Sequence, residues 1–225
     1  MKKIVISLGG SLIYPDNIDT DFIKNFKKLI EDYIRNDYQF ILICGGGKLA
    51  RNFQRAAEDV SELNNEQKDW LGIDATKMNA SLIKSVFNPE DTYEKVISDP
   101  TEKLNLDKKI TICSGWKPGW STDYDAVLMA KNHGADTIIN MSNIDYVYNE
   151  DPKKNPHAKP LEKISWQEFR KMVGDEWSPG LNMPFDPIAA KGAEKNDFKV
   201  IIISKDLNNL KRVLDGKEFV GTTIN

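Results

Sequence analysis

Glycine-rich turns are the segments of this sequence whose residue types are best suited to bind a ligand. Each of them follows a short apolar segment that is typical of a strand. Glycine lacks a Cβ and tolerates a positive φ, so the backbone N–H groups of such turns can point at a phosphate. Lys48 and Arg51 follow one of the turns and add positive charge. We therefore predict phosphate binding at these turns. They are Gly9-Gly10-Ser11, Gly45-Gly46-Gly47-Lys48, Gly115 through Gly119 and, less clearly, the segment after Met141.

Several other functional motifs are absent from the sequence. It contains neither GxxxxGK[ST] nor GxGxxG, which argues against a P-loop and against a dinucleotide-binding fold. His133 and His157 are the only histidines, and neither has metal-ligand or catalytic-triad spacing, so we expect both at the surface. Cys44 and Cys113 each end an apolar run without CxxC spacing. We expect two buried free thiols and no protein-built metal site.

An acidic loop, residues 144–154, follows one predicted strand and leaves two interpretations open. It is either a solvated turn before a proline or a nucleoside-binding segment. In the second case Tyr146 and Tyr148 would pack on a base, and Asp145 and Asp151 would accept hydrogen bonds from ribose hydroxyls.

Composition narrows the class of protein. The chain has 225 residues and a formal net charge of −3, and its charges are interspersed, which argues against a broad nucleic-acid-binding face. No apolar run approaches the roughly 20 residues of a membrane helix. The N-terminal run is interrupted by Gly9 and Gly10 and is typical of a strand rather than of a signal peptide. We expect a cytoplasmic protein without a membrane or nucleic-acid partner.

The elements that position the turns alternate between strand and helix patterns, which predicts an α/β fold with a mostly parallel sheet in one domain, residues 1–225. The predicted strands are Lys2–Leu8, Gln39–Cys44, Lys109–Cys113, Thr137–Met141, Lys199–Ser204 and a strand-like end at 218–224. The predicted helices begin after Asp19 or Thr20, at Lys48, Gln67, Tyr124, Ser165, Ile188 and Leu207. Residues 88–108 have no regular pattern, and Gly134 is expected to end the fourth helix.

The order of the motifs resembles the amino acid kinase superfamily, and within it the uridylate kinases of the archaeal type. The resemblance spans nearly the whole chain and is more specific for the superfamily than for the acceptor. The matching segments are SLGGSLI (7–13), CGGGKLAR (44–51), LGIDATKMNA (71–80), SGWKPGWSTDYDAV (114–127), SNIDYVYNEDPKKNPHAK (142–159), FDPIAAK (185–191) and GTTI (221–224).

This resemblance implies a three-layer α/β/α sandwich that transfers the γ-phosphoryl group of ATP to UMP, with Mg²⁺ and without a covalent enzyme intermediate. It also implies a homo-oligomer, commonly a hexamer, with an acceptor side in roughly residues 1–130 and an ATP side in roughly 131–225. The implied ATP-binding residues are Gly10, Ser11, Gly47, Arg51, Ser142, Asn143, Tyr148 and Asp151. The implied UMP-binding residues are Gly46, Asp69, Trp116, Lys117, Pro118, Gly119, Trp120, Ser121 and Thr122.

Phosphoryl transfer asks a protein mainly for positioning and charge neutralisation, so Lys48 and Arg51 are the expected catalytic residues. Asp186 lies near a helix start, where it either caps the helix or orients a lysine, and we favour the cap.

The chain departs from its relatives at several positions. Many of them have a lysine where this chain has Ser7, smaller or histidine-containing residues where it has Trp116 to Trp120, and a glycine at Tyr146. Two alternatives therefore stay open. One is a kinase of the same fold acting on a carboxylate or an isoprenoid phosphate, and the other is a non-catalytic nucleotide-binding or storage assembly.

Overall fold

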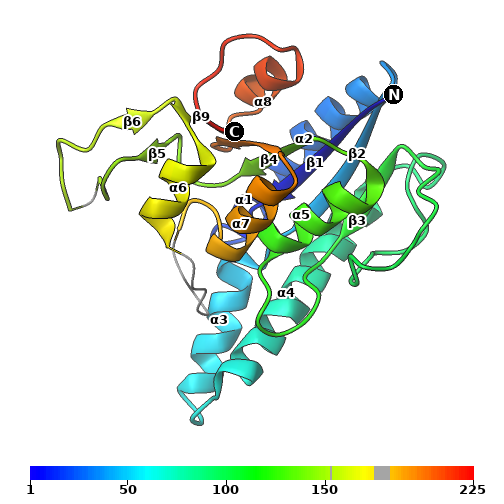
Figure 1. Ribbon diagram of the computed structural model, residues 1–225. Helices are drawn as coiled ribbons and strands as arrows, with labels where there is room; N and C mark the ends of the chain where they lie inside the picture. The colour runs from blue at the N-terminus through cyan, green and yellow to red at the C-terminus, as the bar shows by residue number, and fades with distance from the viewer. Residues whose placement is uncertain (153, 175–182) are drawn as a thin grey trace.

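A seven-stranded sheet forms the centre of the computed structural model, which describes residues 1–152, 154–174 and 183–225 (Figure 1). Its strand order is β3-β2-β1-β4-β8-β9-β7, and the first five strands of that order are parallel. β9 runs antiparallel to β8, and β7 pairs with β9. The strands are β1 (Lys2–Leu8), β2 (Tyr38–Cys44), β3 (Ile110–Cys113), β4 (Thr137–Met141), β7 (Lys163–Ile164), β8 (Lys199–Ile203) and β9 (Thr222–Ile224).

Helices cover both faces of this sheet, because the central strands are apolar on both sides. On β1, Ile4, Ile6 and Leu8 pack with α2, α4 and α8, whereas Val5 faces the core shared with α5, α6 and α7. The α/β prediction with a mostly parallel sheet flanked by helices is confirmed. The helices are α1 (Gly10–Ile13), α2 (Thr20–Ile34), α3 (Gly47–Glu58), α4 (Asn65–Val86), α5 (Thr122–His133), α6 (Trp166–Val173), α7 (Pro187–Lys195) and α8 (Leu207–Leu214). In the described part of the chain, none of them is long and apolar enough to cross a membrane.

The helix ends follow the capping chemistry expected from the sequence. Asp19 accepts a hydrogen bond from the Phe22 amide at the start of α2. Ser165 and Glu168 form a capping box at the start of α6. Gly134 ends α5 in the left-handed conformation, with φ 69°. The expected cap at Asp186 is confirmed, because its Oδ1 accepts from the Ala189 amide at 2.7 Å.

Most predicted boundaries lie within one or two residues of those in the structure, and the last strand differs more. The last strand begins at Thr222 rather than at residue 218, because the Asn209 side chain takes both backbone hydrogen bonds of Val220. The sequence pattern did not predict β7. Nor did it predict the small antiparallel pair β5 (Val147–Tyr148) and β6 (Pro160–Leu161), which extends from the molecule beside α6 (Figure 1).

The predictions about the cysteine and histidine side chains are only partly confirmed. Cys44 and Cys113 are buried free thiols, as expected. His157 is exposed, but the surface prediction for His133 is wrong, because its ring is half-buried and its Nε2 is enclosed. The last turn of α5 lies against β1, where Lys3 Nζ donates to the His133 carbonyl at 2.8 Å.

Candidate active site

The carboxyl ends of the five parallel strands meet at one edge of the sheet. The register aligns Leu8 with both Cys44 and Met141, and Met141 with Ile203. The turns that follow β1, β2, β3, β4 and β8 therefore lie side by side, as predicted for the first four. In open α/β sheets, ligands bind at this edge.

The first two glycine turns are packed directly against each other. A Cβ on Gly10 would lie 2.3 Å from the Gly45 carbonyl oxygen, and one on Gly47, whose φ is +58°, would lie 2.2 Å from the Gly10 carbonyl carbon. Hydrogen bonds of 2.9 Å join the Gly9 amide to Met141 and the Gly45 amide to Leu8. Close backbone contact therefore requires glycine here, independently of any phosphate.

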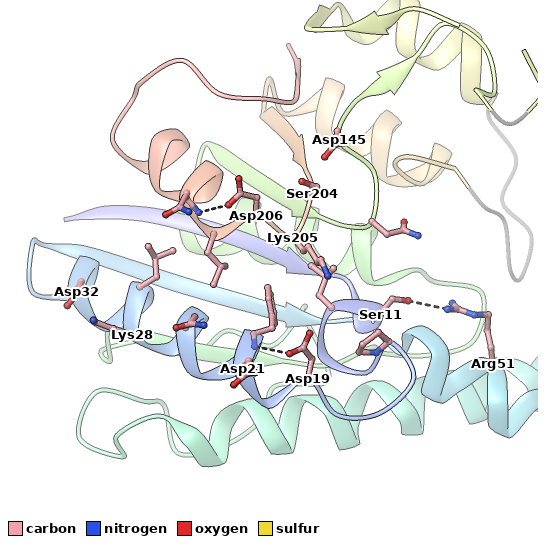
Figure 2. A pocket seen from close by; sticks show the side chains of 18 residues that line it. Ser11, Asp19, Asp21, Lys28, Asp32, Arg51, Asp145, Ser204, Lys205 and Asp206 are labelled. Atoms are coloured by element: carbon pink, nitrogen blue, oxygen red, sulfur yellow. Dashed lines mark hydrogen bonds between the residues drawn. The ribbon is translucent and has the colours of Figure 1, made fainter. Parts of the chain in front are cut away.

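The two predicted catalytic cations lie on the first turns of α3. Arg51 Nη2 donates to Ser11 Oγ at 3.1 Å, which joins α3 to the turn after β1 (Figure 2). Lys48 forms an ion pair with Asp16, in the segment between α1 and α2. Arg51 is therefore held at the glycine turns, whereas Lys48 is engaged by a carboxylate.

A cavity of about 1210 Å³ opens beside Arg51, between α2 and the turn between β8 and α8 (Figure 2). Three of the predicted ATP-binding residues line it: Ser11, Arg51 and Asn143. Asp145 also lines it, as the nucleoside interpretation of the acidic loop allowed.

Sequence reasoning missed Ser204, Lys205 and Asp206 as lining residues of this cavity. They follow the apolar strand β8 directly, and their place at a strand's carboxyl end was the signal that could have found them.

Of the other predicted ATP-binding residues, three lie next to this cavity and two are not part of its lining. Gly10 and Gly47 form its glycine turns, and Ser142 is fixed next to β8 by a 3.0 Å hydrogen bond from its amide to Ile203. Tyr148 and Asp151 are not lining residues, and the Tyr148 ring makes an edge contact with Tyr146 at 6.5 Å between centroids. Lys153, in the same matched segment, lies outside the described residues.

The predicted UMP-binding loop, residues 116–122, follows β3, which β2 and β1 separate from β4 and β8, and it is held by side chains. The Gly119 amide donates to Asp69 Oδ2 at 2.8 Å, so the structure brings together two elements that the resemblance had joined. Trp116 and Trp120 lie 5.4 Å apart by ring centroids. Lys117 Nζ sits 3.8 Å above the Trp116 ring, a cation–π contact that fixes the lysine to the loop.

The remaining predicted acceptor residues frame this loop. Ser121 caps α5 by accepting from the Tyr124 amide, and Thr122 is the first residue of that helix. Gly46 faces α4, because a Cβ there would lie 3.1 Å from the Gly72 carbonyl oxygen. Pro118 lies between the held residues Lys117 and Gly119.

Asp123 joins the predicted UMP-binding loop to the central strands, and it was not among the site residues predicted from the sequence. Its Oδ1 accepts from Ser7 Oγ at 3.0 Å and from Asn140 Nδ2 at 3.2 Å, and its Oδ2 accepts from the Asp186 amide at 3.2 Å. Burial, and secondly the Asp186 charge, raise the pKa of Asp123 to about 6. Ser7, at the position where the resemblance led us to expect a lysine, thus contacts a carboxylate at the end of β1.

Asp125 is a second carboxylate under the same loop and is almost fully buried, with 1% of its surface exposed. Burial is the main cause that raises its pKa to about 8; the Trp116 backbone amide opposes the rise, and the charges of Asp123 and Asp99 contribute to it. The predicted UMP-binding loop therefore rests on two carboxyl groups that ionise at a higher pH than ordinary aspartates do.

Comparison with known proteins gives a consistent result over the full length. The profile of the amino acid kinase family matches residues 2–204. The uridylate kinase of Pyrococcus abyssi is 37% identical over 226 residues, covering 99% of each chain. The crystal structure of uridylate kinase from Archaeoglobus fulgidus superposes with a TM-score of 0.84 at 34% identity, over 100% of both chains. The UMP kinase of Bacillus anthracis has a TM-score of 0.74 at 18% identity, which shows a shared fold.

Proposed function

This chain belongs to the amino acid kinase family, and we propose that it catalyses the ATP-dependent phosphorylation of UMP to UDP. An oxygen of the UMP phosphate forms a bond to the γ-phosphorus, and the bond from that phosphorus to the β–γ bridging oxygen breaks, which releases ADP. One observation carries the proposal. The turns of Gly10 and Gly47 follow β1 and β2, which lie between β3, the strand that leads into residues 116–122, and β8, whose end lines the open cavity. Two nucleotides bound there would meet at the turns.

On the donor side, we assign ATP to the cavity beside Arg51. Ser11, Arg51 and Asn143 line it, which supports the binding roles proposed for them, and Lys205 adds a cation at its wall. Gly10, Gly47 and Ser142 border these residues and complete the phosphate end. Tyr148 and Asp151 are proposed to contact the nucleoside, which requires the β5 segment to approach the bound ligand.

On the acceptor side, we assign UMP to Gly46, Asp69 and the loop of residues 116–122. The hydrogen bond from the Gly119 amide to Asp69 and the contact between the Trp116 and Trp120 rings support this assignment, because they hold the loop in one shape. Transfer needs the acceptor phosphate within reach of the γ-phosphate, and a preorganised loop lowers the entropy cost of that arrangement.

Charge neutralisation falls to Arg51 and Lys48. Arg51 is already held by Ser11 and faces the donor cavity. Lys48 must exchange Asp16 for a phosphate oxygen, because the ion pair occupies its ammonium group. A guanidinium also binds phosphate in a fork geometry that an ammonium cannot reproduce.

The donor cavity fits a nucleotide that arrives with Mg²⁺. Five aspartates and three cationic residues line it, and the described residues contain no cluster of three or more His, Cys, Asp or Glu that could hold a metal alone. Mg²⁺ is commonly held by one or two carboxylates together with substrate phosphates. When bound, it would neutralise phosphate charge; Asp145 and Asp206 are the carboxylates of the carboxyl edge that could contact it.

An ADP-release assay tests the reaction. The protein is incubated with ATP, Mg²⁺ and each of UMP, CMP, AMP, acetylglutamate and isopentenyl phosphate. We expect turnover with UMP to exceed that with every other acceptor. Turnover with a different acceptor and none with UMP would overturn the substrate assignment. ATP binding without turnover would favour the non-catalytic alternative. The structural feature behind that alternative is Ser7, which lies beside Asp123.

We also propose that the protein acts in the cytoplasm, in pyrimidine nucleotide synthesis, as a homo-oligomer, with a hexamer as the expected form. The exposed apolar side chains of α3 and α4 support self-association. Phe53 is 58% exposed, Met78 65% and Trp70 43%. Large apolar side chains that gather on a surface are typical of interfaces. Light scattering after gel filtration measures the assembly, and a monomeric mass would contradict this part of the proposal.

A further inference from the structure

One face of α4 contacts the backbone of several segments at the candidate active site. Thr76 and Asn79 are polar side chains of this helix, with only 5% and 3% of their surface exposed. Because they are three residues apart, they lie on the same face of the helix. Asp69, which accepts from the Gly119 amide, lies about two helical turns before Thr76 and shares this face. Buried polar groups of this kind are hydrogen-bonded, so their partners show what the face of α4 holds.

Thr76 binds the chain where it leaves β3. Its Oγ1 accepts a hydrogen bond from the Gly115 amide at 2.8 Å and donates one to the Ile73 carbonyl at 2.6 Å. The donation to Ile73 fixes the rotation of the hydroxyl group, so a lone pair stays directed at Gly115. Gly115 is itself buried and immediately precedes the predicted UMP-binding loop. Thr76 therefore holds the start of that loop.

Asn79 binds the turn after β2 from the same face of α4. Its Nδ2 donates to the Gly45 carbonyl at 2.8 Å and lies 3.4 Å from the Gly46 carbonyl oxygen. The Gly45–Gly46 peptide bond is trans, and the C=O and N–H groups of a trans peptide point in opposite directions. Because the Gly45 carbonyl points at α4, the Gly46 amide is turned away from this helix. Asn79 thus orients the amide of a predicted UMP-binding residue.

The sheet does not supply this connection between the two turns. The ladder between β2 and β3 ends at the pair formed by Ile43 and Cys113, so Gly45 and Gly115 both lie two residues beyond it. The same helix contacts both of these glycines through two neighbouring side chains. α4 therefore bridges the two chains at the point where the strand pairing has ended.

We propose that Thr76 and Asn79 are positioning residues for phosphoryl transfer, which together fix the predicted UMP-binding loop relative to the turn after β2. This inference rests on the proposed function, because it takes these two segments as the places that hold the acceptor phosphate. Both side chains act through the backbone, at Gly115 and at Gly45. Loss of either contact lets the two segments separate, so fewer bound acceptors lie within reach of the γ-phosphate. We therefore expect kcat to fall while the KM for ATP is retained.

Three threonine variants test the contact to Gly115. Thr76→Val removes the hydroxyl group with little change of shape, and kcat with UMP should fall about tenfold or more, since small displacements of a substrate can cost about 10²-fold. Thr76→Ser keeps the hydroxyl and should restore kcat to within about threefold of the unmodified protein. Thr92→Val is the matched control. It removes another buried hydroxyl that donates to a backbone carbonyl, that of Asn88 at 2.8 Å, beside the amino end of β3.

Asn79→Ala tests the contact to Gly45, and Asn209→Ala is its control. Asn209 is also buried and bonds the backbone of Val220, at the end of the chain after α8. Both variants should unfold at a lower temperature, because each leaves a buried carbonyl without its donor. Only Asn79→Ala should lower kcat, by a factor of about 10². If Asn79→Ala does not fold, the three threonine variants decide the question.

Steady-state kinetics and thermal unfolding of each variant separate the outcomes. An unchanged kcat in Thr76→Val, or an equal fall of kcat in Thr76→Val and Thr92→Val, would overturn the proposal. If the unmodified protein phosphorylates another acceptor and not UMP, the proposed function fails, and the same variants are compared with that acceptor. Absence of turnover with every acceptor would overturn both.

Discussion

The two sides of the glycine turns are built in different ways. On the acceptor side, side chains hold one another: Asp69 accepts from the Gly119 amide, and Lys117 lies over the Trp116 ring. On the donor side, an open cavity is lined by charged groups, and among the contacts described there the Arg51–Ser11 hydrogen bond is the one that reaches the glycine turns.

This difference indicates how each side would position its ligand. A loop that is already held by a hydrogen bond and by contacts between its rings loses little conformational freedom when its ligand binds. The donor cavity carries more carboxylates than cations, so it depends on what arrives with the nucleotide to balance its charge. We therefore expect substitutions on the acceptor side to change affinity for one substrate, and substitutions at the shared turns to affect both.

Gly10→Ala should have the largest effect, because the turn serves both sides. The added Cβ would lie 2.3 Å from a backbone oxygen of Gly45, and neither turn can shift without moving the other. Turnover should fall by a factor on the order of 10³ or more, as expected when several transition-state contacts are displaced together. Steady-state kinetics and thermal unfolding measure the two consequences.

Gly72→Ala is the matched control for that substitution. A Cβ there would meet only the flexible end of Gln54, at 3.3 Å, and alanine favours the helix that contains it. If Gly10→Ala retained near-normal kinetics, the close packing of the two turns would not be what aligns the substrates.

Arg51→Ala should lower turnover by a factor on the order of 10²–10³, the usual effect of removing one electrostatic stabiliser. Lys48→Ala should also lower turnover strongly, but less than Arg51→Ala, because Lys48 must first leave Asp16. Single-turnover kinetics separate transfer from substrate binding. Equal turnover in Arg51→Ala and in the unmodified protein would show that charge neutralisation comes from elsewhere.

Asp125→Asn tests the buried carboxyl under the acceptor loop. Its pKa, about 8 in the folded state, lies above the ordinary value of 3.8, so the folded protein binds an extra proton between these values. Stability should therefore fall as the pH rises from about 4 to about 8, and the variant should lose this dependence. The difference in unfolding free energy between the variant and the unmodified protein should therefore shift in favour of the variant by on the order of 2–4 kcal/mol from pH 4 to pH 8. Chemical denaturation at both pH values measures this gain, and parallel pH profiles would contradict it.

Trp120→Ala and Lys205→Ala form a pair that compares the two sides directly. Loss of the ring, which stacks 4.6 Å from Tyr124, should raise the KM for UMP about tenfold, roughly the value of one base-stacking contact. Loss of Lys205 should instead raise the KM for ATP by a similar or smaller factor, because it lines the donor cavity. If either substitution raised both KM values equally, the division into two sides would be wrong.

Much of the fold could be read from local patterns. The limits of Lys2–Leu8, Thr137–Met141 and Leu207–Leu214 are as predicted, because apolar runs and helical spacing mark them strongly. Capping residues were also predictable, since their hydrogen bonds are local.

The parts that could not be predicted depend on strand order and packing. Ser204, Lys205 and Asp206 reach the donor cavity only because β8 lies beside β4. Asp123 meets Ser7 and Asn140 across two strands, and nothing in its neighbourhood in the sequence indicates that contact. The prediction for His133 was wrong for a similar reason: the end of α5 packs against β1, where Lys3, more than a hundred residues away in the sequence, donates to the His133 carbonyl.

The position of β1 has a consequence for motion. This strand lies between β2 and β4, and the turn that follows it is tied to both neighbours through the amides of Gly9 and Gly45. Amides in the middle of a sheet exchange with solvent only in the rarest, most extensive openings of a protein. The separation between the two nucleotides is therefore set by the slowest-opening part of the molecule, while the loops that admit and release them can move on much shorter timescales.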